Sequence, residues 1–173
     1  PILADLCRKT NETVNLGLPD LYDLLVIDSF RGSQILHATA TAGWRSKYHC
    51  TALGKACMAL WNSSMRQAVY DNCGLPQQTV NTITEIELLD IELDRYRDSG
   101  YAMDIEENEI GVNGVASSIR DGLGEICAAI SVAGPANRLT EQTMTAIAPM
   151  VVNAAKRISE TMGDLETGQP RRA

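Results

Sequence analysis

The stretch from Val112 to Val132, VNGVASSIRDGLGEICAAISV, contains two apolar runs separated by a turn sequence. The runs at 112–119 and 125–132 are rich in valine, isoleucine and alanine, and the tetrapeptide DGLG at 121–124 lies between them. Glycine and aspartate between two such runs favour a tight reversal of the chain. The stretch therefore predicts an antiparallel β-hairpin.

Strand and helix patterns follow one another along the rest of the chain. Apolar alternation, or short apolar runs bounded by turn residues, predicts further strands at 13–18, 24–29, 34–39 and 101–105. Apolar residues that recur every three or four positions predict helices at 2–11, 51–61, 64–73, 84–99 and from Thr140 onward. The strands occur in groups and do not alternate with helices. This order indicates an α+β fold with a central antiparallel sheet flanked by helices, rather than a doubly wound nucleotide-binding sheet.

The helix predicted at 84–99 has the clearest end signals. Thr84 and Glu87 have the spacing of a capping box, and Gly100 is the type of residue that commonly ends a helix. Thr140 similarly predicts the N-cap of the last helix. The stripe expected to be buried on the helix at 84–99 consists of Ile86, Leu89, Leu93 and Tyr96.

Composition and charge narrow the class of protein. The chain has 173 residues, 45% hydrophobic and 21% charged, which suits one globular domain. Its net charge of −7 repels a phosphate backbone, so we do not expect this segment to bind DNA by itself. No apolar run approaches 18 residues, so we expect no membrane partner. The five cysteines are odd in number and form no CxxC pair, which favours reduced thiols in a cytoplasmic protein.

The two ends of the chain suggest where its domain begins and ends. The chain starts with Pro1 and not with methionine, directly in a helical pattern, so we expect a further segment on its N-terminal side. Residues 1–163 are interpreted as one domain. Residues 164–173 are interpreted as a C-terminal tail.

The sequence contains no pattern that is typical of catalysis. The motifs GxSxG, HExxH and CxxC are all absent. The pair GK at 54–55 resembles the end of a phosphate-binding loop, but the upstream glycine is missing and Ala56 stands where a magnesium-binding hydroxyl is needed. His49, Cys50 and Cys57 leave a zinc site open as an alternative, although zinc-ligand spacing is absent. We therefore expect no enzyme, no cofactor and no bound metal.

Three segments are candidates for binding a ligand. The sequence HCTALGKA at 49–56 begins a helix directly after a loop, and the free amides of a helix start attract anions. The alternative is that Thr51 merely caps its own helix. Asp104 lies at the end of the strand at 101–105, where the alternative is an exposed loop acid. Ser131 lies in an apolar strand, where the alternative is a hydrogen bond to a backbone carbonyl.

These segments carry a family resemblance. GW(x)4HCTALGKA at 43–56, RDSGYAMDIEENEIGVNGVASSI at 97–119 and AAISVAGPANRLT at 128–140 occur in that order, and NETVNLGL at 11–18 precedes them. As a set they resemble the effector-binding domain of the IclR family of bacterial transcription regulators. The resemblance extends from about residue 2 to residue 163.

The resemblance implies a fold, partners and a ligand class. It implies a GAF-like α+β domain, preceded by a winged helix-turn-helix domain that contacts DNA, and self-association as a dimer or tetramer. It also implies a small organic acid as effector, such as a keto acid, an aromatic acid or a sugar acid. Other classes remain as alternatives: a small α+β enzyme acting on a carboxylate, a ligand-free GAF-like dimerisation module, and a zinc-dependent sensor.

The resemblance also combines the three candidate segments into one site. The carboxylate of the ligand would meet the amides of Ala52 and Leu53, while Asp104 and Ser131 would contact the other end of the ligand. An ionised Asp104 is expected to stay away from that carboxylate, because like charges repel. The remaining positions of the implied pocket wall are Ser46, Val112, Gly114 and Ala133.

Two of the wall positions depart from the pattern of some relatives, which carry polar side chains there. Gly114 and Ala133 are small and cannot donate a hydrogen bond from a side chain. This departure disfavours a very small ligand such as glyoxylate or pyruvate. It would also leave room for a bulkier acid.

Overall fold

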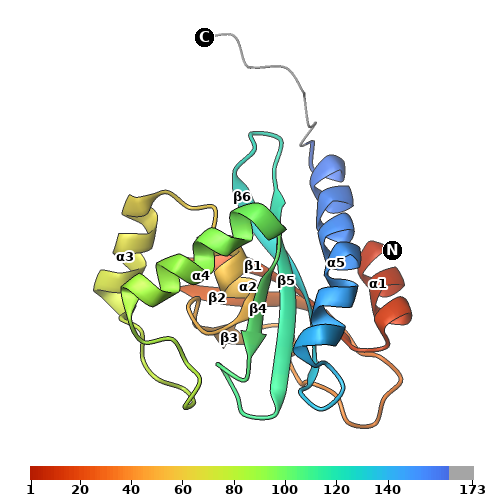
Figure 1. The fold of residues 1–173 in the computed structure, drawn as a ribbon. Helices are drawn as coiled ribbons and strands as arrows, with labels where there is room; N and C mark the ends of the chain where they lie inside the picture. Colours follow the sequence, from red (N-terminus) through yellow and green to blue (C-terminus); the bar gives the residue numbers. More distant parts are fainter. Residues whose placement is uncertain (164–173) are drawn as a thin grey trace.

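The computed structural model describes residues 1–163, so the expected tail at 164–173 lies outside the described residues. Six strands form one sheet in which every neighbouring pair is antiparallel, in the order β3-β2-β1-β6-β5-β4 (Figure 1). The strands are β1 (Thr13–Asp20), β2 (Asp23–Phe30), β3 (Arg45–Ser46), β4 (Ala102–Ile105), β5 (Val112–Arg120) and β6 (Ile126–Pro135). The predicted α+β class and its central antiparallel sheet are confirmed.

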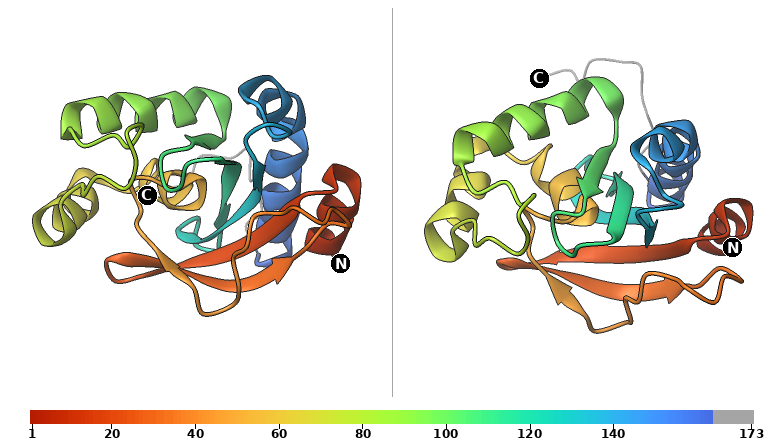
Figure 2. Two further views of the ribbon diagram at one scale, coloured as in Figure 1. Left: turned by 90° about the horizontal axis from the view of Figure 1, so that it is seen from below. Right: turned by 60° about the horizontal axis from the view of Figure 1, so that its bottom comes forward.

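Helices cover both faces of this sheet (Figure 2). They are α1 (Ile2–Thr10), α2 (Ala52–Met58), α3 (Ser63–Cys73), α4 (Ile86–Ser99) and α5 (Glu141–Thr161). Helices α1 and α5 share one apolar core with the sheet, and α2, α3 and α4 share a second core on the opposite face. None of the helices that the structure describes is both long enough and apolar enough to cross a membrane.

The two faces of β5 show why α2 can lie so close to the sheet. Val115 and Ile119 point into the core of α1 and α5, while Ala116 points into the core of α2. All seven residues of α2 are buried. Gly54 makes this packing possible on the other side of the helix, because a Cβ atom there would lie 2.3 Å from the carbonyl oxygen of Tyr48.

The strand predicted at 34–39 is wrong. This segment has no regular structure, and Ile35 is 99% exposed. The free edge of β2 is paired elsewhere, because Val26 exchanges backbone hydrogen bonds with Gly43 and Trp44, and β3 continues that edge. An alternating segment forms a strand only where a neighbouring strand offers unpaired amides and carbonyls.

The helix ends are partly as predicted. Gly100 ends α4 in the left-handed conformation, and Thr140 caps α5 by accepting a hydrogen bond from the Thr143 amide. The capping box predicted at the start of α4 does not form, since Glu85 is the N-cap and no side chain caps the helix there. In the predicted stripe, Ile86 is 37% exposed. The other stripe residues are buried: Leu89, Leu93 and Tyr96.

Candidate functional site

A cavity of about 90 Å³ lies where the start of α2 meets the sheet. The loop at 38–44 and the segment at 104–109 complete its wall. Seven of the eight residues predicted for the ligand site line this cavity: Ala52, Leu53, Asp104, Val112, Gly114, Ser131 and Ala133. The structure therefore brings together segments that are far apart in the sequence.

The strand register explains how the floor of the cavity is built. Asp104 pairs with Gly114 across β4 and β5, and Gly114 pairs with Ala133 across β5 and β6. Two residues along β6, Ser131 pairs with Asn15 of β1. Residues two apart on a strand share a face. The side chains of Asp104, Ser131 and Asn15 consequently lie on the same face of the sheet, which is the face covered by α2.

The start of α2 supplies unpaired amides to this cavity. The hydroxyl of Thr51 accepts a hydrogen bond from the Gly54 amide at 3.1 Å and donates one to the Lys47 carbonyl at 2.9 Å. Thr51 therefore caps the helix, as the alternative interpretation expected, but it occupies only the third amide. Within residues 1–163, the amides of Ala52 and Leu53 have no hydrogen-bond partner. Thr51 can therefore cap the helix while the amides of Ala52 and Leu53 stay available to a ligand.

Asp104 is a buried acid and not an exposed loop residue, with 7% of its surface accessible. Its Oδ1 atom accepts hydrogen bonds from the amides of Glu107 at 2.8 Å and Asn108 at 3.4 Å, which folds the loop over the cavity. Burial raises the pKa of Asp104 to about 7, and the nearby Glu107 carboxylate adds to this effect. The side chain is therefore protonated in a large fraction of molecules at neutral pH, in contrast to the fully ionised group expected from the sequence.

Ser131 is 3% exposed, yet no other described residue forms a hydrogen bond with its hydroxyl. The alternative that this hydroxyl simply bonds a backbone carbonyl is therefore not what the described part of the chain shows. Asn15 lies beside it and uses its Oδ1 atom to accept from the Ser29 hydroxyl at 2.8 Å. The amide nitrogen of Asn15 and the hydroxyl of Ser131 are thus the neutral polar groups of the cavity floor.

Ser46 is the predicted residue that the structure does not place in the cavity wall. It lies in β3 opposite Leu24, and its buried hydroxyl has no partner among the described residues. Sequence reasoning also missed several wall residues: Asn15, Ala38, Thr39, Ala40, Asn108, Glu109 and Asn113. Asn15 belongs to the NETVNLGL segment, where its alternation with Val14 indicates that the two side chains lie on opposite faces of the strand. This pattern could have identified Asn15 as a candidate. Ala38 and Thr39 have no such signal, because the local pattern predicts a strand at 34–39.

A buried ion pair stabilises the loop that carries Glu107, next to the cavity. The ammonium group of Lys55 is fully buried, 2.5 Å from Glu107 Oε1 and 3.9 Å from Glu92 Oε1 of α4. Burial raises the pKa of Glu107, and Lys55 opposes that shift. Lys55 therefore anchors the loop that also binds Asp104, and it is not placed to hold a phosphate as in a phosphate-binding loop.

The alternative of a metal site finds no support in the side-chain arrangement. No group of three or more histidine, cysteine, aspartate or glutamate residues in the described chain could hold a metal ion. The Nε2 atom of His49 lies 3.1 Å from the carbonyl oxygen of Pro76. Cys57 is fully buried in the core of α2.

Comparison with known sequences agrees with this architecture. Residues 1–160 match the family model described as bacterial transcriptional regulator IclR C-terminal. The chain is 32% identical over 163 residues to the HTH-type transcriptional repressor AllR of Salmonella typhi, and 30% identical to AllR of Escherichia coli K12. Each alignment covers 94% of this chain and 60% of the relative, so the chain spans about 60% of the length of these relatives.

Solved structures with the same fold include other regulators. The IclR protein of Thermotoga maritima is similar with a TM-score of 0.89 and 33% identity, over 94% of this chain and 66% of that chain. The C-terminal domain of the E. coli transcriptional regulator KdgR gives a TM-score of 0.83 and 29% identity, over 94% of both chains. The matched proteins are transcriptional regulators and not enzymes.

Proposed function

The chain belongs to the IclR family of bacterial transcriptional regulators, as their C-terminal, effector-binding domain, and from this membership we propose that the cavity at the start of α2 binds a small organic acid. The observation that carries the proposal is the set of unpaired polar groups in that cavity. They are the amides of Ala52 and Leu53 and the hydroxyl of Ser131. Buried polar groups are normally hydrogen-bonded, so such a set favours a ligand that completes it.

The chemistry of these groups favours a carboxylate at the helix start. Two unpaired amides and the positive end of the helix dipole stabilise an anion there. Ser131 can donate to or accept from a keto or hydroxyl oxygen at the other end of the ligand. A protonated Asp104 can donate as well and does not repel the anion, so the partial neutralisation of this acid supports the proposal.

The volume of the cavity favours a short ligand. Its roughly 90 Å³ is smaller than the cavities of about 150 Å³ that hold a benzene molecule in engineered proteins. Gly114 and Ala133 are small, but a Cβ atom at Gly114 would lie 3.4 Å from the Cβ of Ala52, and Ala40 and Trp44 also line the cavity. The cavity therefore does not favour the bulkier acid expected from these two positions. We therefore place aliphatic keto and hydroxy acids ahead of aromatic acids.

The output of binding is proposed to be a population shift. Charge-assisted hydrogen bonds contribute about 1.5–3 kcal/mol each before desolvation and ordering are subtracted, which gives micromolar to millimolar affinity. A nearly complete two-state switch needs about 5.5 kcal/mol of differential binding. Several subunits of a dimer or tetramer acting together would supply it. DNA would be contacted by a preceding winged helix-turn-helix domain, in a cytoplasmic regulator.

Thermal stability of the purified domain against a panel of keto, hydroxy, aromatic and sugar acids tests this proposal. A ligand that binds the folded state raises the melting temperature in a dose-dependent way. Ser131→Ala should weaken the effect of the active acid about ten-fold, because one hydrogen bond to a polar ligand is lost. Ser46→Ala is the matched control, since its hydroxyl is also buried and unpartnered but does not line the cavity.

The outcomes separate the competing functions. Equal effects of Ser131→Ala and Ser46→Ala would place the ligand elsewhere. The absence of any stabilising acid would favour the ligand-free dimerisation module. If chromatography shows that the protein steadily consumes a stabilising acid, the result would favour an enzyme.

A further inference from the structure

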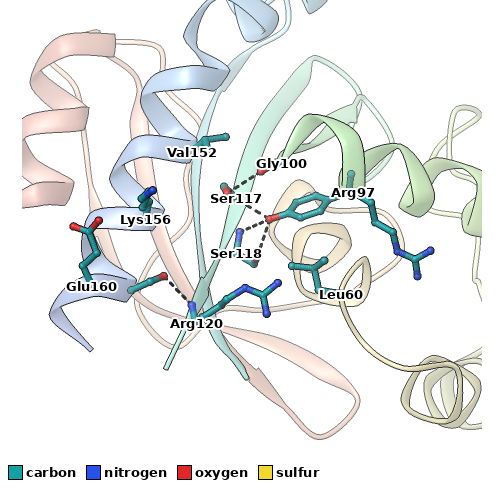
Figure 3. Close-up of a pocket in the computed structure, with 11 residues that line it drawn as sticks. Leu60, Arg97, Gly100, Ser117, Ser118, Arg120, Val152, Lys156 and Glu160 are labelled. Atoms are coloured by element: carbon teal, nitrogen blue, oxygen red, sulfur yellow. Dashed lines mark hydrogen bonds between the residues drawn. The ribbon is translucent and has the colours of Figure 1, made fainter. Parts of the chain in front are cut away.

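A second hollow lies at the edge of the sheet, where residues 117–120 of β5 extend beyond the end of β4, away from the cavity described above. It is a cleft of about 290 Å³ between the C-terminal end of α4, β5 and α5 (Figure 3). Its charged lining is the unusual feature, because it contains three cations, Arg97, Arg120 and Lys156, and one carboxylate, Glu160. The chain as a whole has 22 acidic and 15 basic residues, so this concentration of positive charge runs against the overall balance.

The floor of the cleft is a network of hydroxyl groups held in fixed positions. The Tyr96 hydroxyl accepts from the Ser118 amide at 2.8 Å and lies 2.7 Å from the Ser118 hydroxyl. The Ser117 hydroxyl donates to the Gly100 carbonyl at 2.9 Å. On the α5 side, the Ser159 hydroxyl accepts from the amide of Arg120 at 2.9 Å. These hydrogen bonds hold the polar groups of the cleft floor in place before any ligand binds.

The arginines are only partly used by the protein itself. Arg120 donates from Nη1 to the Gly124 carbonyl at 2.7 Å, which orients the guanidinium and leaves its other N–H groups without a partner among the described residues. Arg97 pairs with Asp94 on its own helix at 2.9 Å and keeps 57% of its side chain exposed. Arg97 and Arg120 extend from α4 and β5 on one side of the cleft, and Lys156 projects from α5 on the other (Figure 3).

We propose that this cleft is a second ligand site, which takes a small phosphate-bearing anion independently of the acid at the start of α2. Guanidinium groups bind phosphate oxygens with paired, charge-assisted hydrogen bonds, and an ammonium group adds a point charge. The two guanidinium groups of Arg97 and Arg120 offer several donors at one cleft, which suits a phosphate or pyrophosphate better than a single carboxylate. A phosphorylated metabolite bound here would lie between α4, β5 and α5 and would report on a second metabolic signal.

Sodium pyrophosphate, titrated at constant ionic strength into the purified domain, is the probe. A saturable rise in melting temperature is expected, and sodium chloride of equal ionic strength should not reproduce it. Arg97→Gln and Arg120→Gln should each weaken binding about ten-fold, because each removes charge-assisted hydrogen bonds. Each variant is compared with its own ligand-free melting temperature, so a loss of fold is not mistaken for a loss of binding.

Arg95→Gln is the matched control for Arg97→Gln. Both residues lie on α4 and both pair with an acid three positions earlier, but Arg95 does not line the cleft. The proposal is overturned if the two variants weaken pyrophosphate binding equally, or if chloride gives the same shift. It is also overturned, in favour of a contact with a nucleic-acid backbone, if duplex DNA at the same phosphate concentration binds more tightly than pyrophosphate. Binding of an organic acid at the α2 cavity should be unchanged in Arg97→Gln, so failure of either site is distinguishable from failure of the other.

Discussion

Asp104 is a residue whose protonation links the site to stability. Its pKa is raised by burial from 3.8 to about 7 in the folded state, so the folded protein holds the proton more tightly than the unfolded chain. The free energy of unfolding therefore decreases as pH rises from about 4 to about 7. Asp104→Asn cannot ionise and keeps an oxygen for the Glu107 amide. Its stability relative to the wild type should improve by roughly 2 kcal/mol between pH 5 and pH 8.

Denaturant unfolding of both proteins across this pH range measures the difference directly. Titrating groups that do not interact with Asp104 affect the two proteins alike and cancel. A stability difference that stays constant with pH would mean that the pKa of Asp104 is not raised.

The same pKa predicts how an organic acid binds. Since protonated Asp104 removes a negative charge from the cavity, the affinity for a carboxylate should increase as pH falls from 8 to 6. Asp104→Asn should bind with little dependence on pH over this interval. Titration calorimetry at several pH values tests this, and tighter binding of the wild type at the higher pH would contradict it.

Lys55 and Glu107 form a buried pair whose loss should be costly. Lys55→Met leaves the Glu107 carboxylate buried without its cation and should reduce the free energy of unfolding by about 3–5 kcal/mol. In Lys55→Met with Glu107→Gln, the uncompensated charge is gone, so the double variant should lose less than the sum of the single variants. Additive losses in urea unfolding would show that the two side chains are not coupled.

Site residues could be predicted from the sequence where a short local motif marks them, but not where their role depends on distant residues. Asp104 and Ser131 stand at recognisable positions in strands and motifs, and the structure brings both to one cavity. The pairing of Lys55 with Glu107 joins residues 52 positions apart, which no local pattern specifies. Ser46 followed only from resemblance, and the structure places it in the two-residue strand β3, outside the cavity wall.

At the scale of elements, two threonines with similar sequence contexts behave differently. Thr140 caps α5 by accepting from the Thr143 amide at 3.2 Å, whereas Thr84 lies outside α4 and caps nothing. Thr140→Ala should therefore cost about 1 kcal/mol of stability, and Thr84→Ala should be nearly neutral. Thermal unfolding of the two variants side by side tests this contrast. A comparable loss of stability in Thr84→Ala would mean that Thr84 does cap α4, as the capping-box spacing predicts.

Gly54 sets the position of α2 and hence of the cavity. Helix propensity alone favours Gly54→Ala by about 1 kcal/mol. The added methyl group would lie 2.3 Å from the Tyr48 carbonyl oxygen, and forcing such a contact costs about 1–3 kcal/mol or more. We therefore expect a net loss of stability together with weaker binding of an organic acid, because the start of α2 must move. An increase in melting temperature would mean that the turn before α2 yields easily.

The elements that local pattern failed to predict are those that depend on pairing. The hairpin of β5 and β6 contains its own turn, so its strands followed from the sequence. The segment at 34–39 has a similar alternation, but the edge it would need is occupied by Gly43, Trp44 and β3. Sequence pattern identifies a chain that can form a strand, whereas the neighbouring elements decide whether it does.

At the scale of the whole molecule, the charge distribution limits what this domain can contact. Its net charge of −7 opposes approach to a polyanion, while the cleft between α4, β5 and α5 attracts a single small one. Non-specific DNA-binding proteins bind with dissociation constants of about 10⁻⁴ to 10⁻⁶ M at physiological salt. This domain should bind duplex DNA more weakly than that range, because three cations on one patch release few counterions.

Fluorescence anisotropy with a labelled duplex of random sequence, at several salt concentrations, measures this. Anisotropy that stays flat at physiological salt would agree with DNA contact through a preceding domain only. Binding that appears there, weakens steeply with salt and disappears in Arg97→Gln would instead assign the cleft to the DNA backbone. Since the same variant removes pyrophosphate binding under the first interpretation, comparing the two ligands on one variant decides which anion the positive cleft serves.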